Sequence, residues 1–509
     1  MGFPILSVIC FMPILTALIV FFIPESNLSL LKKVPIVMMG ANLLLSLYCF
    51  INYDVAAGGF QFSENIPVVK DLGINYIMAV DGISMPLVLL TSLIIFAGTC
   101  ISFDMDMRVK EFYIFLMILV TGVYGVFLTQ NLLFFYIFFE FALVPMYPLI
   151  GIWGSKRKEY AAMKLVLYLL IGSVFVLIGI ISMYLYAAQP DVLGAYTLDM
   201  QTLFNIDYPV DLQIFVYGLM ALGLGFLVKM FPFHTWSPLG YAAAPTAVSM
   251  LHAGVIVKLG GYGLIRLAVS CFPDGAHFWA PVIAILCMVN IVYGACIALV
   301  QHDLKLLVGY ACVSHMGYIL LGVATLNALS LSGAVSQMVA HGLMTSCYFA
   351  LIGYIYHQAG TRDLTRFQGL AKQMPRMAVA FSMVSLACLG LPGMFNFVAE
   401  FLIFMGSFTS EKVIFGFISY KVLSIIAISG IVITATYCLR AVRRMFMGPR
   451  DPQWDYLRDI HGIYLVAPIV LLGGLLAFGL WPYHITDMVQ SGVAPMLVKL
   501  SQSTMGGIF

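Results

Sequence analysis

Charged residues are scarce in this sequence: Asp, Glu, Lys and Arg make up only 9% of its 509 residues, against about 25% in a typical soluble domain. A chain of this length with so little charge lacks the water-facing surface that a soluble fold needs. Its net charge of +2 also lacks the strongly basic character of nucleic-acid-binding proteins. These shortages exclude the common soluble classes and indicate that the lipid bilayer is the solvent of this chain.

Clustered cysteines and nucleotide-binding or hydrolase motifs are absent as well. The ten cysteines are scattered and form no C-x-x-C pair, whereas metal and iron–sulfur sites need several thiolates close together. We therefore expect neither a metal site nor an iron–sulfur cluster in this chain. The sequence contains no G-x-S-x-G, P-loop or complete G-x-G-x-x-G pattern, so a soluble-enzyme mechanism is not indicated. The first residues lack a basic region and an A-x-A-like cleavage site, so we expect 4–23 to be a retained helix.

Hydrophobic residues, in contrast, make up 62% of the chain, and aromatic residues make up 14%. A membrane-spanning helix needs about 20 mainly apolar residues. The sequence predicts fourteen such spans, at 4–23, 34–52, 82–103, 111–128, 131–153, 163–187, 212–236, 244–271, 279–300, 303–324, 332–358, 377–409, 414–442 and 463–484. The predicted fold class is therefore an all-α integral membrane protein.

Basic residues are distributed unequally between the predicted loops. With the N-terminus outside, the cytoplasmic side holds 18 lysines and arginines, whereas the opposite side holds five: Lys70, Arg266, Lys412, Lys421 and Lys499. Two more lie inside spans. Cytoplasmic loops carry an excess of basic residues, so we expect both termini on the periplasmic or outer side.

Four ionisable residues lie inside strongly apolar segments: Glu140, Lys229, Lys258 and Glu400. A charge at the centre of a bilayer costs roughly 2.5–3.5 kcal/mol on insertion scales, and such residues normally mark ion or proton routes. Burial in an apolar medium lowers the pKa of lysine and raises that of glutamate in general, so both can exchange protons near neutral pH. The alternative is that they form structural ion pairs which only tie helices together.

Two histidines, His315 and His341, lie in apolar segments between these charges. Gln337, His341 and Thr345 are spaced four residues apart, which places them on one face of a helix. Such a polar stripe suits an internal file of water molecules. The alternatives are core histidines that bond a neighbouring helix and a bis-histidine haem, for which no other feature of the sequence argues.

Two predicted helices contain breaks beside a charge. Pro232 and Pro238 follow Lys229, and Leu391-Pro392-Gly393 precedes Glu400, 171 positions further on. Corresponding breaks in two halves are typical of inverted-repeat transporters. We predict N-terminal helices at 1–110, a first five-helix repeat at 111–272 (helices 4–8), a second, inverted repeat at 273–445 (helices 9–13) and a C-terminal helix and tail at 446–509.

Several stretches together resemble the antiporter-like, proton-translocating subunits of NADH-quinone oxidoreductase (respiratory complex I), and most of all those of the subunit M type. They are FFYIFFEFALVPMYPLIGIWG, FPFHTW, AAAPTAVSMLHAGVIVKLGGYGLIR, QHDLKLLVGYACVSHMGY, QMVAHGL and FNFVAEF. The resemblance covers residues 131 to about 405. It implies a proton relay through Glu140, Lys229, Lys258, His315, His341 and Glu400. It further implies that Glu140 pairs with Lys229, and that a glutamate at position 400 distinguishes subunit M from sister subunits that carry lysine.

The resemblance also implies how the chain works. Proton movement in it would be coupled to quinone reduction elsewhere in the complex, with NADH, FMN, iron–sulfur clusters and quinone held by partner subunits. The partners would be other membrane-arm subunits, and the location an energy-coupling membrane, most simply the bacterial inner membrane. A multisubunit sodium/proton antiporter and a ferredoxin- or hydrogenase-linked membrane complex are the alternatives.

One segment departs from the pattern of the resembled subunits. They carry Asp, His and Glu where this chain has Leu239, Tyr241 and Ala243. Lys229 also stands seven residues before Trp236, a shorter interval than in those subunits. His252 replaces an apolar residue near Lys258 and is a candidate to substitute in part for the missing polar groups. The proton entry route is the feature that this departure leaves open.

Overall fold

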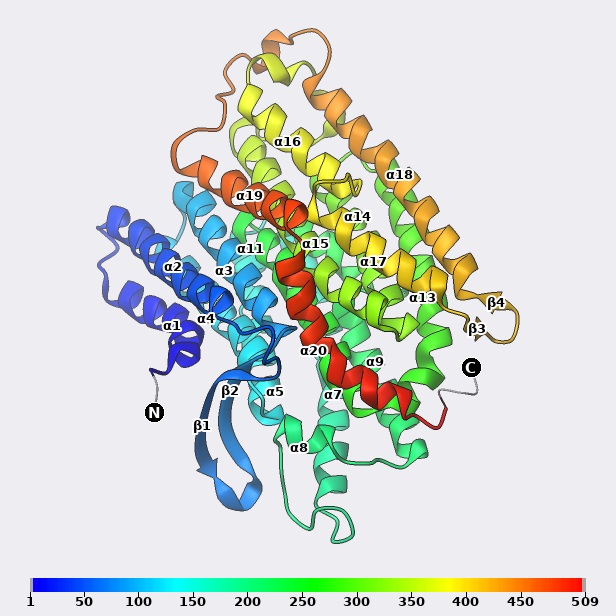
Figure 1. Cartoon of the computed structure of the whole chain (residues 1–509). Coiled ribbons are helices and arrows are strands. Elements are labelled where there is room, and N and C mark those ends of the chain that lie inside the picture. The colour runs from blue at the N-terminus through cyan, green and yellow to red at the C-terminus, as the bar shows by residue number, and fades with distance from the viewer. Residues whose placement is uncertain (1–2, 506–509) are drawn as a thin grey trace.

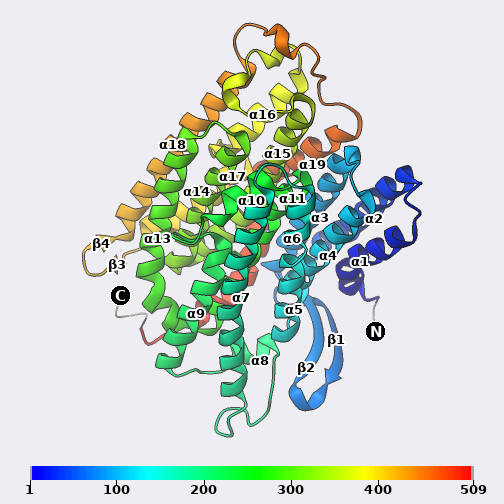
Figure 2. The same ribbon diagram turned by 180° about the vertical axis from the view of Figure 1, so that it is seen from behind.

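The computed structural model of this chain describes residues 3–505, and Figures 1 and 2 show an elongated bundle of helices. Within that range, thirteen helices are long and apolar enough to cross a membrane. They are Ile5–Phe22 (α1), Leu28–Ile51 (α2), Ser84–Asp104 (α3 with η2), Val109–Leu128 (α4), Leu132–Trp153 (α5 and α6), Lys158–Ala187 (α7), Val210–Val228 (α9), Thr246–Val269 (α11, η3, α12 and η4), Pro273–Val300 (α13), Leu304–Thr325 (α14), Ala328–Ala359 (α15), Tyr420–Phe446 (α18) and Gly462–Leu480 (η8 and α19). The prediction of an all-α integral membrane protein is confirmed.

The predicted span at 377–409 is divided into two shorter apolar helices, Pro375–Cys388 (α16) and Phe395–Thr409 (α17). Between them, Gly390 and Gly393 adopt positive φ angles of 66° and 96°, a region that glycine enters without a steric cost. Pro392 between them has no N–H to donate. Because neither piece alone has the length of a span, the total of fourteen stays a prediction.

The predicted helix at 212–236 also breaks, beside Lys229. α9 ends at Val228, Lys229 follows with φ 64°, and the chain turns before Trp236–Ala243 (α10) begins. A non-glycine residue with positive φ is uncommon and costs of the order of 1–2 kcal/mol. A third bend lies at Pro145, which separates Leu132–Leu143 (α5) from Met146–Trp153 (α6).

The helix that contains Lys258 is irregular. It consists of Thr246–Leu251 (α11), a π-helical turn at His252–Ile256 (η3), Val257–Gly263 (α12) and a second π-helical turn at Leu264–Val269 (η4). π-helical turns are rare and are often found at functional sites. Lys258 lies in the α-helical piece between them.

A β-hairpin fills part of the connection between α2 and α3. Gln61–Val69 (β1) pairs antiparallel with Ile74–Val80 (β2) across the turn Lys70–Leu72 (η1). Figure 1 shows it at the lower end of the bundle, near Met200–Phe204 (α8). We call this end the hairpin face. A second pair of two-residue strands, Val413–Ile414 (β3) and Ile418–Ser419 (β4), precedes α18.

A further helix, Tyr483–Ser501 (α20), occupies the region predicted as a tail after residue 484. Figure 1 shows it descending from the end of Val466–Leu480 (α19) toward the hairpin face. The opposite end of the bundle carries the connections around α16 and the short turns Leu364–Arg366 (η5), Leu370–Lys372 (η6) and Pro452–Trp454 (η7).

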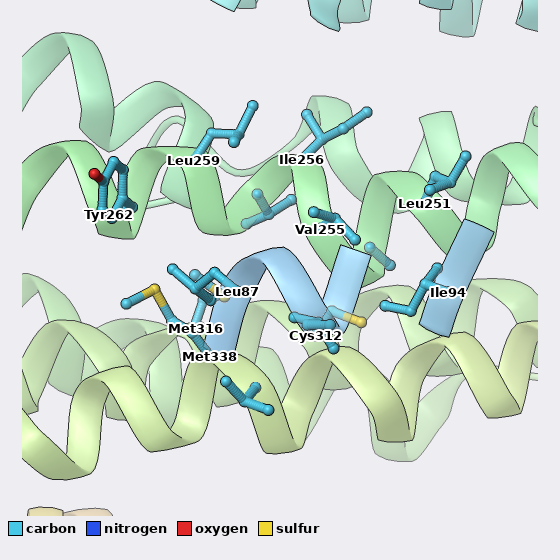
Figure 3. Packing of buried hydrophobic residues seen from close by; sticks show 14 of the residues in the cluster. Leu87, Ile94, Leu251, Val255, Ile256, Leu259, Tyr262, Cys312, Met316 and Met338 are labelled. Carbon is cyan, nitrogen blue, oxygen red and sulfur yellow. The ribbon is translucent and has the colours of Figure 1, made fainter. Parts of the chain in front are cut away.

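The centre of the bundle consists of α15 and the α11–η4 helix, whose hydrophobic stretches are surrounded by protein along their whole length. Figure 3 shows Leu87, Val255, Met316 and Met338 from neighbouring helices packed into this core. At the edge, α2 is mostly exposed, as a lipid-facing helix should be. The central helices therefore have the position in which buried polar side chains contact each other rather than lipid.

Candidate functional site: a row of buried ionisable side chains

Five of the six predicted relay residues are buried. Lys229, Lys258, His315, His341 and Glu400 are each no more than 3% exposed. Glu140 is half-buried on α5. Ionisable groups at such depth are costly unless they pair with one another, so their mutual distances decide what they can do.

Four of the residues form a row across the bundle. The Nζ of Lys258 lies 2.8 Å from the Nδ1 of His341, and it donates a hydrogen bond of 2.5 Å to the carbonyl oxygen of Ala253. The rings of His341 and His315 follow, with centroids 5.6 Å apart. The Nδ1 of His315 lies 3.4 Å from the Oε1 of Glu400. These contacts connect α12, α15, α14 and α17 in a single line of groups that can accept and release protons.

Two neighbours hold the Glu400 end of the row. Gln337, one of the residues of the predicted polar stripe, donates from Nε2 to the Oε1 of Glu400 over 3.1 Å. On the other side, the Sγ of Cys388 lies 3.3 Å from the Nε2 of His315, so the thiol and the imidazole are within hydrogen-bonding distance. Cys388 ends α16 and Glu400 lies in α17, so both arms of the broken helix contact the same histidine.

Lys229 stands apart from this row. Among residues 3–505 its ammonium has no hydrogen-bond or ion-pair partner, and it lies 4.7 Å from the centroid of the Tyr241 ring. A cation over an aromatic face is stabilised by the quadrupole of the ring. The backbone beside it is tied by Asn290, whose Nδ2 donates to the carbonyl of Lys229 over 2.8 Å and whose Oδ1 accepts from the N–H of Phe231 over 2.6 Å.

The expected pair of Glu140 with Lys229 is not formed in this structure. No ion pair within 4.0 Å joins them in the described chain, and the Oε1 of Glu140 is buried without a hydrogen-bond partner. The geometry explains why: Glu140 is half-buried on α5, whereas the ammonium of Lys229 faces the ring of Tyr241 in α10. The Nζ of Lys229 and the Oε1 of Glu140 are therefore buried atoms without a hydrogen-bond partner in residues 3–505.

The segment that departs from the resembled pattern forms an aromatic stack beside Lys229. Tyr241 is fully buried and meets the ring of His252 edge-on, with centroids 4.8 Å apart. His252 stacks on Trp236 at 5.2 Å, and neither ring nitrogen of His252 has a hydrogen-bond partner in residues 3–505. Tyr241 thus contacts both His252 and Lys229, and His252 acts in this structure as a packing residue.

The sequence reading missed several polar contacts. Lys305 is only 3% exposed. It lies in the first turn of α14, where its Nζ donates to the carbonyl of Ala244 over 2.7 Å and to the Oγ of Ser249 over 3.2 Å. Asn290 and Cys388 were also missed, since no spacing in the sequence marks either of them.

Metal-binding geometry is not found in the described chain. Among residues 3–505 no three His, Cys, Asp or Glu side chains converge as ligands of a metal ion. The ten cysteines are free thiols, and nine of them are buried.

A multi-pass bundle with a row of lysine, histidines and glutamate across its centre defines a membrane protein of the antiporter-like class. Residues 129–427 match the family described as NADH:quinone oxidoreductase/Mrp antiporter, transmembrane. This match covers more than half of the chain, and the chain belongs to that family.

Similar proteins agree with this assignment along nearly the whole chain. The NAD(P)H-quinone oxidoreductase chain 4 1 of Synechococcus sp. (strain JA-2-3B'a(2-13)) is 36% identical over 502 residues, which cover 97% of this chain and 93% of the relative. Chain 4 2 of Thermosynechococcus vestitus (strain NIES-2133 / IAM M-273 / BP-1) is 35% identical over 499 residues, 97% of this chain and 92% of that relative.

Solved structures share the fold. A chain of respiratory complex I from Thermus thermophilus with bound NADH superposes with a TM-score of 0.86 at 24% identity, covering 97% of this chain and 99% of that one. A chain of the Mrp complex from Dietzia sp. DQ12-45-1b gives a TM-score of 0.81 at 19% identity, with 97% of each chain covered. The likeness of both structures extends over the broken helices as well as the outer ones.

Proposed function

We propose that this chain is the proton-translocating, subunit M-like membrane-arm subunit of a complex I-type NADH-quinone oxidoreductase. The observation that carries the proposal is the row Lys258–His341–His315–Glu400, which runs through the middle of the bundle. Its relatives at 35–36% identity are named as chain 4 of NAD(P)H-quinone oxidoreductases. The chain would contribute proton transfer, and the redox chemistry would take place in other subunits.

The residues of the relay have distinct roles in this proposal. Lys258 and Glu400 are the two ends of the central row, and His341 and His315 pass the proton between them. Lys229, near Tyr241, would load the row, and Glu140 would attract the proton toward Lys229 when the two approach each other. An opposite charge that approaches a buried lysine favours its charged form, so movement of Glu140 would switch Lys229 between holding and releasing a proton.

The two broken helices support an internal repeat. Lys229 follows the end of α9, and Glu400 follows the break between α16 and α17, 171 positions later. We propose that 111–272 and 273–445 are the two inverted repeats, with 1–110 and 446–509 added at either end. Fourteen spans result if α16 and α17 together count as one.

The orientation that we propose places the hairpin face and both termini on the outer, periplasmic side of a bacterial inner membrane. The excess of basic residues in the opposite loops supports it. NADH, FMN, iron–sulfur clusters and quinone would be bound by partner subunits, and the exposed apolar helices would contact lipid and the neighbouring membrane-arm subunits.

The proposal is tested with the whole complex in sealed vesicles. Lys258→Ala removes one end of the row, so we expect the number of protons moved per electron to fall while assembly and electron transfer to quinone persist. Lys421→Ala, at an exposed helix end, is the matched control and should change neither quantity.

Two outcomes would contradict the proposal. An unchanged proton-to-electron ratio in Lys258→Ala would exclude the row as the proton path. Sodium-dependent proton exchange that persists without any electron donor would instead identify a subunit of a sodium/proton antiporter.

A further inference from the structure

A cavity of about 260 Å³ opens at the hairpin face, away from the row described above. Its mouth is lined by exposed residues of the hairpin connection, α8 and α20, among them Gly59, Gln201 and Pro495. Its floor is lined by the buried residues Gln130 and Asp81 and by the nearly buried Arg266. The cavity therefore leads from the surface to a set of polar and charged groups inside the bundle.

An ion pair closes the floor of this cavity. The Nη2 of Arg266 lies 2.6 Å from the Oδ2 of Asp81, and the two side chains are 11% and 4% exposed. The second oxygen of Asp81 accepts hydrogen bonds from the backbone N–H of Ile83 over 3.2 Å and of Ser84 over 3.0 Å, where α3 begins. The pair thus links the end of the Lys258 helix to the start of α3.

Buried polar atoms without partners occur at Gln130, which lines the floor of the cavity, and at Tyr262, four residues before Arg266 in the sequence. Gln130 is fully buried, and within residues 3–505 neither its Oε1 nor its Nε2 has a hydrogen-bond partner; the hydroxyl of Tyr262 is in the same condition. Buried polar groups are nearly always hydrogen-bonded, to protein or to ordered water. Water occupies roughly 30 Å³ per molecule in the liquid and enters buried sites that are polar and wide enough. The floor of this cavity supplies polar groups, and its volume of about 260 Å³ is wide enough for water.

The polar groups continue from the cavity to the proton row along one helix. Lys258, Tyr262 and Arg266 are spaced four residues apart along α12 and η4. At about 1.5 Å of rise per residue, the Cα atoms of Lys258 and Arg266 are separated by about 12 Å along the axis. The guanidinium of Arg266 lies 5.9 Å from the ring centroid of Tyr262. Figure 3 shows Tyr262 on the same helix as Val255 and Leu259, within the apolar core.

We propose that this cavity is a hydrated access path that carries protons between Lys258 and the hairpin face, and that the Arg266–Asp81 pair controls it. The inference rests on the proposed function, because it needs Lys258 to exchange protons. Water in the cavity and the hydroxyl of Tyr262 supply the intermediate positions. The pair sets the local charge: while Asp81 faces Arg266, the guanidinium is neutralised and a proton can approach, whereas an unpaired guanidinium repels it.

The first test measures access of water without measuring proton transport. Cys271 lines the cavity, whereas Cys287 is fully buried in α13 outside its lining. The intact complex in sealed vesicles is treated from each side with the membrane-impermeant thiol reagent 2-sulfonatoethyl methanethiosulfonate, and the modified peptides are quantified by mass spectrometry. Cys271→Ser identifies the Cys271 signal.

We expect Cys271 to react at least tenfold faster than Cys287, and only from the side of the hairpin face. Equal rates for the two thiols would overturn the access path. Because this readout does not depend on proton transport, its failure would leave the proposed function of the chain untouched, whereas an unchanged proton ratio in Lys258→Ala would contradict that function directly.

The second test concerns the ion pair. Asp81→Asn keeps the size of the side chain and the oxygen that accepts from Ile83 and Ser84, since asparagine caps helices as well as aspartate does, but it leaves Arg266 unpaired. We expect about tenfold slower proton translocation, with the Cys271 reaction rate preserved. Asp274→Asn is the control, because Asp274 is a buried carboxylate that accepts from Ser503 and does not line the cavity.

The third test concerns the link to Lys258. Tyr262→Phe removes only the hydroxyl and should slow translocation severalfold, whereas Tyr113→Phe removes a hydroxyl that bonds the carbonyl of Ser102 elsewhere in the bundle and should not. Full translocation rates in both Asp81→Asn and Tyr262→Phe would overturn the proposed path even if Cys271 were accessible.

Discussion

The two broken helices hold their charges in opposite surroundings. At the α9–α10 break the ammonium of Lys229 has no polar partner within residues 3–505 and faces the ring of Tyr241. Beside the α16–α17 break the carboxylate of Glu400 accepts a hydrogen bond from Gln337 and lies 3.4 Å from His315. A buried charge without a partner costs several kcal/mol, whereas a hydrogen-bonded one is far less costly. The carboxylate of Glu400 is therefore stabilised by polar contacts, whereas the ammonium of Lys229 is held in a high-energy arrangement.

The two breaks are also built from different residues. The first relies on a side chain, since Asn290 bonds the backbone on both sides of the turn at Lys229. The second relies on glycine: a Cβ at Gly390, which has φ 66°, would come within 2.6 Å of the Oε2 of Glu400. Removing the side-chain amide of Asn290 should therefore weaken the first break, whereas the second break requires that Gly390 has no side chain. The following changes test this contrast.

The largest effect is expected for Glu400→Gln. Glutamine still accepts from Gln337 but cannot carry a proton, so the rate of proton translocation should fall about 100-fold, the range typical for loss of an acid–base group, while the complex stays assembled. Proton flux and quinone reduction are measured together in vesicles. Glu411→Gln, at an exposed position, is the control, and similar rates in the two variants would refute the role of Glu400.

Asn290→Ala should destabilise the first break by about 2–3 kcal/mol, because the carbonyl of Lys229 and the N–H of Phe231 lose their partner inside the protein. The thermal midpoint of the purified complex reports the loss. Asn42→Ala provides the comparison: Asn42 is also fully buried, but its amide makes a single 3.3 Å bond to the carbonyl of Ile9. If the two variants lose equal stability, Asn290 has no special role at the break.

Lys229→Met should raise stability by about 1–2 kcal/mol, because it replaces an unpartnered buried amine by an apolar side chain of similar length. Proton translocation should fall at the same time, as expected where function requires a costly group. Lys258→Met should instead lower stability, since it removes an amine that bonds His341 and the carbonyl of Ala253. A lower thermal midpoint in Lys229→Met would contradict the contrast between the two breaks.

The smallest effect is expected for His252→Phe. The ring of His252 stacks on Trp236 and meets Tyr241, and its nitrogens make no hydrogen bonds in the described chain. An aromatic ring of similar shape should change stability by less than about 1 kcal/mol and leave the translocation rate within about twofold. A larger loss of rate would show that His252 carries protons and compensates for the altered segment beside Lys229.

Much of the fold follows from apolar segment length alone. Thirteen helices of membrane-spanning length and both breaks lie where the hydrophobic runs and the prolines predict them. The β1–β2 hairpin and α20 were not predicted, because their sequences lack the long apolar run that marks a span. Each is placed by contacts with distant parts of the chain, which local patterns do not contain.

The structure buries five of the six residues that the sequence predicted as a proton relay, and their role in that relay stays a prediction. Ionisable side chains in apolar segments are conspicuous, and four of them meet in the central row. Contacts between residues that are distant in the sequence were not predicted. Asp81 and Arg266, which form an ion pair, are 185 positions apart. The Glu140–Lys229 pair, inferred from resemblance, is absent from this structure because the ammonium of Lys229 faces Tyr241.

The two π-helical turns on either side of Lys258 have a mechanical consequence. A π turn holds one residue more than an α turn, and its conversion to α-helix rotates the intervening segment by about 100°. Lys258 lies between two such turns, η3 and η4. If one turn tightens while the other widens, the ammonium can swing around the helix axis while both ends of the helix stay fixed in the bundle. The segment that carries Lys258 can thus rotate about the helix axis without any movement of the helix ends.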